Sequence, residues 1–384
     1  MSADRTLRWS GDGIVSIAEI GLNHGGSADR ALEMVDAAAH AGATAIKLQS
    51  IVAEKLVSAA ASLQHVGATS LRDFFRGLEL DWEAHRAIVA RARARGVFAL
   101  TTAFAVDTVP VLAALGFDGF KIASGDLTYT DLVGAVAATG RPVVLSSGMS
   151  TVDEVATALA VARSAGAHEL AVLHCVSAYP TPVADENLRA IATVRAACGV
   201  PVGLSDHGRG LASAIAAVAL GATVYERHFV LAGDDAAIDR AVSSTPEELA
   251  AIVTAMETTR VALGDGHKTC RAAERANRGA SRRGLYAARA LAAGDVVTAA
   301  DVAVLRPSAA LSPSDVQRLV GHVLARHVAA GEPFAEIEGS RKLDREDSNQ
   351  MSQVFSARTK CGQADTALAR RSRTLAGPRR SLAR

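Results

Sequence analysis

The chain of 384 residues contains few cysteines, and none of them form a CxxC pair. The four cysteines are widely separated, at Cys175, Cys198, Cys270 and Cys361. Zinc ribbons and disulfide-stapled small domains need closely spaced cysteines, so the sequence argues against both classes. Hydrophobic residues make up 49% of the chain, which is ordinary for a globular protein with a large core. A wholly disordered chain is therefore excluded.

Long apolar runs are also missing. No run reaches the ~18 residues that a membrane-spanning helix needs. The N-terminal segment MSADRTLRWSGDG has no apolar core of the kind found in a signal peptide. We therefore expect a soluble, cytoplasmic protein with no membrane partner.

The chain has no general excess of charge of one sign, and its formal net charge is +1. Residues 340–384 are basic, with 11 Lys or Arg and 4 Asp or Glu, and the remainder is mildly acidic, with 30 and 36. An acidic body is not typical of nucleic-acid binding, so we expect no nucleic-acid partner. The basic end is poor in apolar residues, which predicts a disordered tail.

No GxGxxG turn follows the first predicted strand, which argues against a doubly wound open sheet. Short β-branched or apolar runs instead alternate with Ala-rich helical stretches such as 28–41, 82–95 and 151–165. This alternation predicts parallel pairing through right-handed crossovers, and eight units in about 250 residues predict an α/β fold, a closed (β/α)₈ TIM barrel. The predicted strands are Ile14–Ile20, Ala43–Leu48, Val97–Thr102, Gly119–Ala123, Pro142–Ser146, Leu170–His174, Val200–Leu204 and Thr223–Glu226.

The pattern changes after about Gly264. The following stretch is polar and basic, and after it Gly284–Glu338 has short strands, one small helix and two similar turn signals around Gly294 and Gly331. This stretch predicts a separate small, β-rich domain. The predicted organisation is a barrel over 1–265, a linker over 266–283, the small domain over 284–339 and the tail over 340–384.

Polar side chains gather at the C-terminal ends of the predicted strands, where barrels of this kind build their active sites. Lys47, Lys121 and Arg227 would converge there with several Ser and Thr hydroxyls. Such a set suits a phosphate and a carboxylate. The alternative is that each lysine pairs with a nearby carboxylate. A mid-strand lysine is costly to bury without a partner, and we favour the anionic ligand.

Two histidines, His207 and His228, follow neighbouring strands. Two neutral imidazoles about one strand spacing apart could bind a divalent metal and leave positions open for substrate and water. From spacing alone, two unrelated polar histidines remain the alternative, because no HExxH motif is present. Glu19 also stands at a strand end, where it could act as a base, sit beside the metal or cap the next helix.

Seven segments, in order along the chain, resemble the N-acetylneuraminate (sialic acid) synthase family. Gly284–Glu338 resembles the C-terminal antifreeze-like (SAF) domain of this family through VLRPS (304–308) and LVGHVLARHVAAGEP (319–333). The resemblance covers roughly residues 14 to 338. The seven segments are IAEIGLNHGGS (17–27), AGATAIKLQ (41–49), FKIASGDLT (120–128), PVVLSSGMS (142–150), LHCVSAYPTP (173–182), GLSDHGRG (203–210) and ERHFVL (226–231).

The resemblance implies an enzyme, a carbon–carbon bond-forming transferase. It would condense phosphoenolpyruvate with an N-acylated amino-sugar aldehyde and water, releasing a nonulosonic (sialic) acid and phosphate. It also implies a domain-swapped homodimer in which Arg306 reaches the partner's barrel. His207 and His228 would bind a divalent metal, Mn²⁺ before Mg²⁺ or Co²⁺. The phosphoenolpyruvate residues would be Lys47, Thr102, Lys121, Ser124, Ser146 and Ser205. The residues facing the sugar or the reacting carbons would be Glu19, Gln49, Asp126, Tyr179 and Asp239.

The sequence departs from the family mainly on the side that would face the sugar. The usual Gly-Pro-Asp reads Ala237-Ile238-Asp239, and the residue after this aspartate is Arg240 where the family has histidine. We therefore keep open an acceptor leading to legionaminic- or pseudaminic-type acids, another sugar, or an anionic sugar held by Arg240. A metal-dependent barrel aldolase that does not use phosphoenolpyruvate and a non-catalytic binding barrel are the competing classes.

Overall fold

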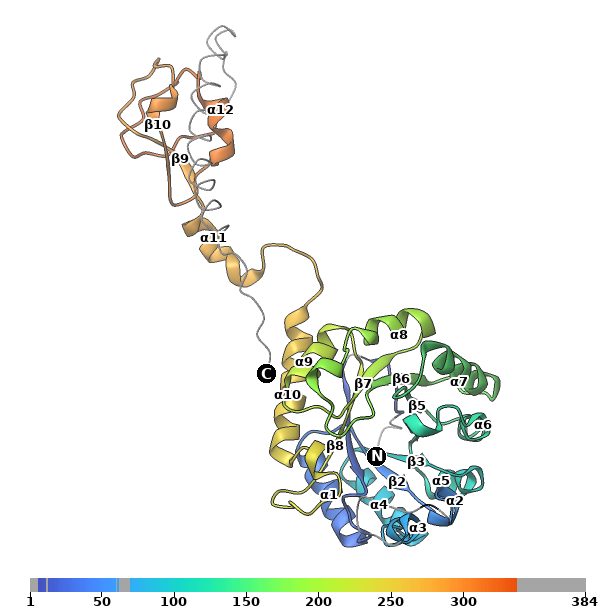
Figure 1. The fold of residues 1–384 in the computed structure, drawn as a ribbon. Helices are drawn as coiled ribbons and strands as arrows, with labels where there is room; N and C mark the ends of the chain where they lie inside the picture. The colour runs from blue at the N-terminus through green and yellow to red at the C-terminus, as the bar shows by residue number, and fades with distance from the viewer. Residues whose placement is uncertain (1–5, 12, 60, 62–69, 337–384) are drawn as a thin grey trace, which may run out of the picture. The chain divides into compact units, whose positions relative to one another are not determined.

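A computed structural model describes residues 6–11, 13–59, 61 and 70–336 (Figure 1). The chain divides between His267 and Lys268 into two compact units. The tail predicted over 340–384, and the last residues of the predicted small domain, lie outside the described residues.

Eight parallel strands close into a barrel in the first unit, in the order in which they follow along the chain. The predicted TIM barrel is confirmed, and each predicted strand overlaps an observed one. The strands are β1 (Val15–Gly21), β2 (Ala45–Ser50), β3 (Phe98–Ala103), β4 (Gly119–Ile122), β5 (Val143–Ser146), β6 (Leu170–Cys175), β7 (Val202–Asp206) and β8 (Val224–His228).

Helices follow the strands and surround the barrel (Figure 1). Several begin at a residue whose side chain accepts a hydrogen bond from the first turn, as at Ser27, Asp81, Thr151 and Thr245. None of the helices in the described part of the chain is long and apolar enough to cross a membrane. The helices of this unit are α1 (Ala28–His40), α2 (Ala53–Leu56), α3 (Leu71–Arg76), α4 (Trp82–Ala94), α5 (Val109–Leu115), α6 (Thr130–Ala137), α7 (Val152–Ser164), α8 (Ala190–Cys198), α9 (Ala212–Ala219) and α10 (Pro246–Leu263).

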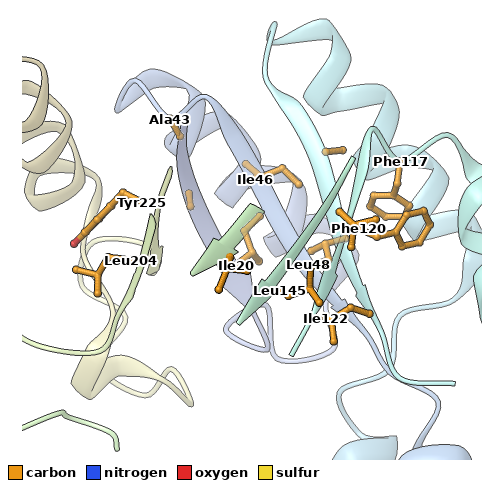
Figure 2. Packing of buried hydrophobic residues seen from close by; sticks show 14 of the residues in the cluster. Ile20, Ala43, Ile46, Leu48, Phe117, Phe120, Ile122, Leu145, Leu204 and Tyr225 are labelled. Atoms are coloured by element: carbon orange, nitrogen blue, oxygen red, sulfur yellow. The ribbon is translucent and has the colours of Figure 1, made fainter. Parts of the chain in front are cut away.

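Alternation along the strands divides their side chains between two environments. One set packs with the helices in the main core, and Figure 2 shows Ile20, Ile46, Leu48, Ile122 and Leu145 from this set. The other set points into the barrel. Its members near the N-terminal ends of the strands, the lower end of the barrel, form a second apolar cluster. Its members near the C-terminal ends, the upper end, are polar. The strand sequence therefore fixes an apolar floor and a polar mouth.

The N-terminal segment closes the lower end of the barrel. Leu7 and Trp9 are buried and belong to the same cluster as the inward residues Ile17 and Leu100. The backbone amide of Trp9 donates to Glu169 Oε1 at 2.7 Å. A Cβ on Gly119 would meet Leu7 Cδ2 at 3.2 Å, so the glycine at this position leaves the leucine its space.

The second unit contains α11 (Arg275–Ser281), β9 (Gly284–Ala287), β10 (Val302–Leu305) and α12 (Val316–Leu319). The two strands pair antiparallel, and short bridges extend the pairing elsewhere in the unit. Both predicted turns have their glycine in the left-handed region, with φ of 89° at Gly294 and 80° at Gly331. This unit has its own small core: Leu285, Ala287, Leu291, Val297, Leu311, Leu319, Leu324, Val328 and Phe334.

Candidate active site

A cavity of about 410 Å³ opens at the C-terminal ends of the barrel strands. Most of the residues that the sequence placed in a common site line this cavity. Those lining it are Glu19, Lys47, Gln49, Thr102, Lys121, Ser124, Ser146, Tyr179, Ser205, His207 and His228. Backbone register explains the convergence, because Glu19 pairs in register with Lys47 and His228, and Thr102 with Lys121.

Two buried lysines share a single carboxylate at the base of this cavity, that of Glu226. Lys121 Nζ lies 2.6 Å from Glu226 Oε1, and Ser205 Oγ donates to the same oxygen at 2.9 Å. Lys47 Nζ lies 2.8 Å from Glu19 Oε2 and 3.7 Å from Glu226 Oε2. Both lysines therefore pair with carboxylates. This pairing is the alternative that the sequence analysis gave to an anionic ligand.

The sharing of Glu226 leaves the two ammonium groups unequal. Burial lowers the pKa of Lys121, and although Glu226 opposes this, neighbouring Lys47 adds to it, so that pKa lies below its usual value. For Lys47 burial acts in the same direction, but Glu19 and Glu226 outweigh it and the pKa is raised. Burial also acts on Glu226, yet both lysines hold the pKa of that carboxyl far below its usual range. Lys121 is therefore the cation with the less complete counter-charge.

Lys121 also has hydrogen-bonding capacity left. An ammonium group has three N–H donors. Among the described residues, Lys121 donates only to Glu226, whereas Lys47 meets Glu19 and also donates to Thr102 Oγ1 at 3.2 Å. The free donors of Lys121 and the hydroxyl of Ser146 border the same cavity. This part of the site can accept an oxyanion without breaking the existing ion pairs.

Glu19 is held in place from two sides at the mouth of β1. Gln49 Nε2 donates to its Oε1 at 2.9 Å, and Lys47 pairs with its Oε2. The register of β1 against β2 shifts between Glu19 and Gly21. Gly21 has φ of 56°, and a Cβ there would lie 3.2 Å from Glu19 Oε1, so this irregularity needs glycine.

His207 and His228 form an adjacent pair of imidazoles, with ring centroids 5.5 Å apart. His207 Nδ1 is 2.9 Å from the carbonyl oxygen of Val176, and His228 Nδ1 is 3.3 Å from Asp239 Oδ2. Metal-binding histidines usually make such contacts with the ring nitrogen that does not bind the metal. The pair therefore fits a divalent ion. Within the described residues, however, no group of three or more His, Cys, Asp or Glu side chains is arranged to hold one.

Asp239 is fixed by the loop after β8. Its backbone amide donates to Asn23 Oδ1 at 2.9 Å, and Asn23 Nδ2 donates to the carbonyl of Phe229 at 2.8 Å. Burial acts to raise the pKa of Asp239, but His228 outweighs it and the pKa is lowered. Asp239 thus stands as a carboxylate beside the histidine pair, although it does not line the cavity itself.

Ser124 and Cys175 form another part of the cavity wall. Ser124 Oγ accepts a hydrogen bond from the Gly148 amide at 3.1 Å and lies 3.6 Å from Cys175 Sγ. A Cβ on Gly148 would meet Ser124 Oγ at 2.7 Å and Ser177 Oγ at 2.3 Å, so no other residue would allow this close approach. Tyr179 stacks over His207, with centroids 4.2 Å apart.

Two predicted site residues lie elsewhere. Asp126 follows β4, is half-buried and does not line the cavity, and burial raises its pKa. Arg306 belongs to the second unit, where it is exposed and follows β10. The sequence analysis gives Arg306 a role in the partner's barrel, and this stays a prediction.

The prediction that Arg227 lies with Lys47 and Lys121 in the active-site cavity is wrong. Arg227 pairs with Asp206 at 2.9 Å and borders a different cavity, because its neighbours Glu226 and His228 take the inward face of β8. Glu226 is the central residue that the sequence analysis left out of the site. Strand alternation carried the signal, since residues two apart share a face and His228 was already placed inward.

Comparisons with known proteins identify the family of the chain. Residues 34–268 match the NeuB family, and residues 282–336 match the SAF domain. The chain belongs to the NeuB family. Its second unit contains the SAF domain expected from the sequence.

Relatives of the chain are named as synthases of nonulosonic acids. The chain is 31% identical to N,N'-diacetyllegionaminic acid synthase of Campylobacter jejuni over 83% of this chain and 98% of the relative. It is 30% identical to a pseudaminic acid synthase of the same species, over 83% and 95%. A crystal structure of N-acetylneuraminic acid synthetase from Leptospira borgpetersenii, in complex with citrate, matches with a TM-score of 0.61 and 33% identity over 70% of this chain and 91% of that chain.

Proposed function

We propose that this NeuB-family protein condenses phosphoenolpyruvate with an N-acylated amino-sugar aldehyde and water, giving a nonulosonic acid and phosphate. The observation that carries the proposal is the incompletely neutralised Lys121 at the base of the cavity, beside Lys47 and the hydroxyls of Ser146 and Ser205. Such a set suits the phosphate and carboxylate of phosphoenolpyruvate. The relatives' names support a nonulosonic acid as the product.

The reaction makes one carbon–carbon bond. The methylene carbon of phosphoenolpyruvate attacks the aldehyde carbon, whose oxygen becomes a hydroxyl. The oxygen of water bonds to the carbon that carries phosphate as water gives up one proton, which balances the proton that the former aldehyde oxygen gains. The carbon–oxygen bond to phosphate then breaks as a keto group forms at that carbon, and the phosphate leaves with the second proton of the water. Glu19 stands at the mouth as the group that can take the proton of this water. Lys121, through its free N–H donors, and the hydroxyl of Ser146 stabilise the charge of the departing phosphate.

The proposal includes a divalent metal, Mn²⁺ before Mg²⁺ or Co²⁺, held by His207 and His228. When bound, the metal would polarise the aldehyde as a Lewis acid. Val176 and Asp239 keep the two imidazole rings oriented. Tyr179 covers His207 and, with Gln49, provides the side of the cavity where the sugar would lie.

The proposal includes two classes of acceptor sugar. N-acetylmannosamine would give N-acetylneuraminate, whereas 6-deoxy diacetamido hexoses would give legionaminic- or pseudaminic-type acids. The loop that holds Asp239 departs from the family pattern, and the relatives named for the latter products support including those sugars. Arg306, supplied by the partner subunit of a domain-swapped homodimer, would hold the acyl group.

Phosphate release tests the proposal directly. The full chain is incubated with phosphoenolpyruvate, Mn²⁺ and a panel of N-acetylmannosamine, its 6-phosphate, 6-deoxy diacetamido hexoses and unacylated aldoses. We expect sugar-dependent release that a chelator abolishes, and a loss of at least ~100-fold in Lys121→Gln but not in the exposed control Arg86→Gln. No release with any sugar, from folded and metal-loaded protein, would overturn the proposal.

Mixed subunits test the role of Arg306. Arg306→Ala and His207→Ala chains are each expected to be inactive. Mixing them restores activity if the arginine acts on the partner's barrel, because one barrel in the mixed dimer then has both groups. No recovery in mixtures that form dimers contradicts action across subunits.

A further inference from the structure

A second cavity, of about 690 Å³, lies beside the barrel between the segments that follow β7 and β8. It shares no lining residue with the candidate active site. Strand β8 separates the two, because Glu226 and His228 border the active-site cavity while Arg227 between them borders the other. The volume is in the range that holds a ligand the size of a sugar phosphate.

Three arginines line this second cavity, and each is held differently. Arg227 is buried, with 5% of its surface exposed, and donates through Nη1 to Asp206 Oδ2. Its Nε is buried and has no hydrogen-bond partner in the part of the chain that the structure describes. Arg209 is exposed and, among the described residues, has no ion-pair or hydrogen-bond partner. Within the same described residues, Arg240 meets only Asp235, at 3.3 Å, and that carboxylate is 87% exposed.

A buried hydroxyl adds to the same surface. Ser244 has 1% of its surface exposed and lines the cavity. A buried polar atom without a partner, such as Arg227 Nε among the described residues, is costly, so a ligand that pairs with it is favoured. The other lining carboxylate, Glu248, is engaged with the Thr245 amide at the start of α10.

We propose that this cavity is a second binding site, for the phosphate group of a small phosphorylated molecule. Arginine presents paired N–H donors that match phosphate oxygens, and Ser244 supplies a hydroxyl donor. Barrels of this fold frequently bind phosphate with the loops after strands 7 and 8, which are the loops that line this cavity. The site also accounts for Arg240, which borders this cavity rather than the active-site cavity.

Binding of inorganic phosphate to the full chain tests the site. Titration calorimetry at constant ionic strength compares Arg209→Gln/Arg240→Gln with Arg86→Gln/Arg318→Gln, which removes the same charge from exposed positions elsewhere. Neither pair of substitutions touches the barrel interior. We expect at least ten-fold weaker binding, or loss of one binding event, only in the first variant. Equal affinity and stoichiometry in the two variants would overturn the proposal.

Kinetic arms identify the source of the phosphate. Because β8 separates the two cavities, the phosphate of an acceptor that reacts in the active site would not reach this one, and a raised KM for N-acetylmannosamine 6-phosphate alone in the first variant would contradict that separation. If a separate ligand carries the phosphate, phosphate binding weakens and the KM values for N-acetylmannosamine 6-phosphate and N-acetylmannosamine both stay the same. The calorimetric result does not need turnover, so the site can stand even if the proposed reaction fails.

Discussion

The lower and upper halves of the barrel interior are built by the same strands and do opposite things. In the lower half Ile17 and Leu100 pack with Trp9 into an apolar cluster. Two residues further along the same strands, Glu19 and Thr102 face a charged cavity. An apolar layer needs only shape and volume, whereas the charged layer needs a partner for every group.

The residues that stabilise the fold and the residues that could bind ligands therefore lie in different halves of the barrel interior. The floor can be changed with a cost in folding and none in binding. The mouth cannot, because Glu226 pairs with two lysines at once, and each of these is also a candidate ligand group. The following predictions test this separation.

Removing the shared carboxylate should have the largest effect. Glu226→Ala leaves Lys47 and Lys121 buried with one carboxylate fewer, which costs about 4–5 kcal/mol of unfolding free energy in urea titrations. Phosphate release should also fall by at least ~100-fold. Glu226→Gln keeps the volume and should lose as much activity with less loss of stability. An unfolding free energy equal to that of the wild type in Glu226→Ala would contradict this prediction, because water would then hydrate the lysines in place of the carboxylate.

Removing the floor should affect folding alone. Trp9→Ala deletes a fully buried ring and should lower the unfolding free energy by about 3–4 kcal/mol, with KM unchanged in the folded fraction. The second tryptophan, Trp82, is 36% exposed and serves as the matched control. Trp82→Ala should cost about 1 kcal/mol or less. A raised KM in Trp9→Ala would break the separation of the two halves.

Acid should lower the free energy of unfolding through His24, which lies in the loop after β1. Burial, with smaller effects from His85 and Arg30, lowers the pKa of His24 to about 4. The unfolded chain takes up the proton near pH 6.5, so stability is lost as the pH falls from about 6.5 to 4, by about 3 kcal/mol. His24→Asn should flatten this slope, measured by urea unfolding at several pH values. The exposed His40→Gln should not, and equal slopes in all three proteins would contradict the assignment.

The smallest effect comes from a single methylene in the floor. Ile17 lies two residues below Glu19 on β1 and is fully buried. Ile17→Val should cost about 1 kcal/mol and leave KM unchanged. Ile238, 42% exposed on the loop after β8, is the control, and Ile238→Val should leave the unfolding free energy unchanged.

Much of the fold could be predicted from the sequence because the barrel repeats one local pattern. Short apolar strands and capped helices each depend on neighbours in sequence, and the predicted helices 28–41, 82–95 and 151–165 contain α1, α4 and α7. The strand ends also identified the cavity, since they meet at one mouth.

The rest could not be predicted because it depends on which side of a strand each residue faces and on what lies across the barrel. Arg227 and Glu226 are adjacent in sequence, yet one lines the second cavity and the other the first. That Glu226 of β8 would serve Lys121 of β4 follows only from the closed barrel, where strands far apart in sequence face one another.

Leu7 and Trp9 close the lower end of the barrel, and this affects the order in which ligands can enter and leave. With the lower end closed, ligands reach the barrel interior through the mouth alone. Lys121 is buried at the base, while Tyr179 is 57% exposed at the rim. A ligand held by the lysines must therefore arrive before one seated beneath Tyr179, and whatever it leaves at the base must depart last. For the proposed reaction, the depth of the cavity therefore predicts the order in which ligands enter and leave.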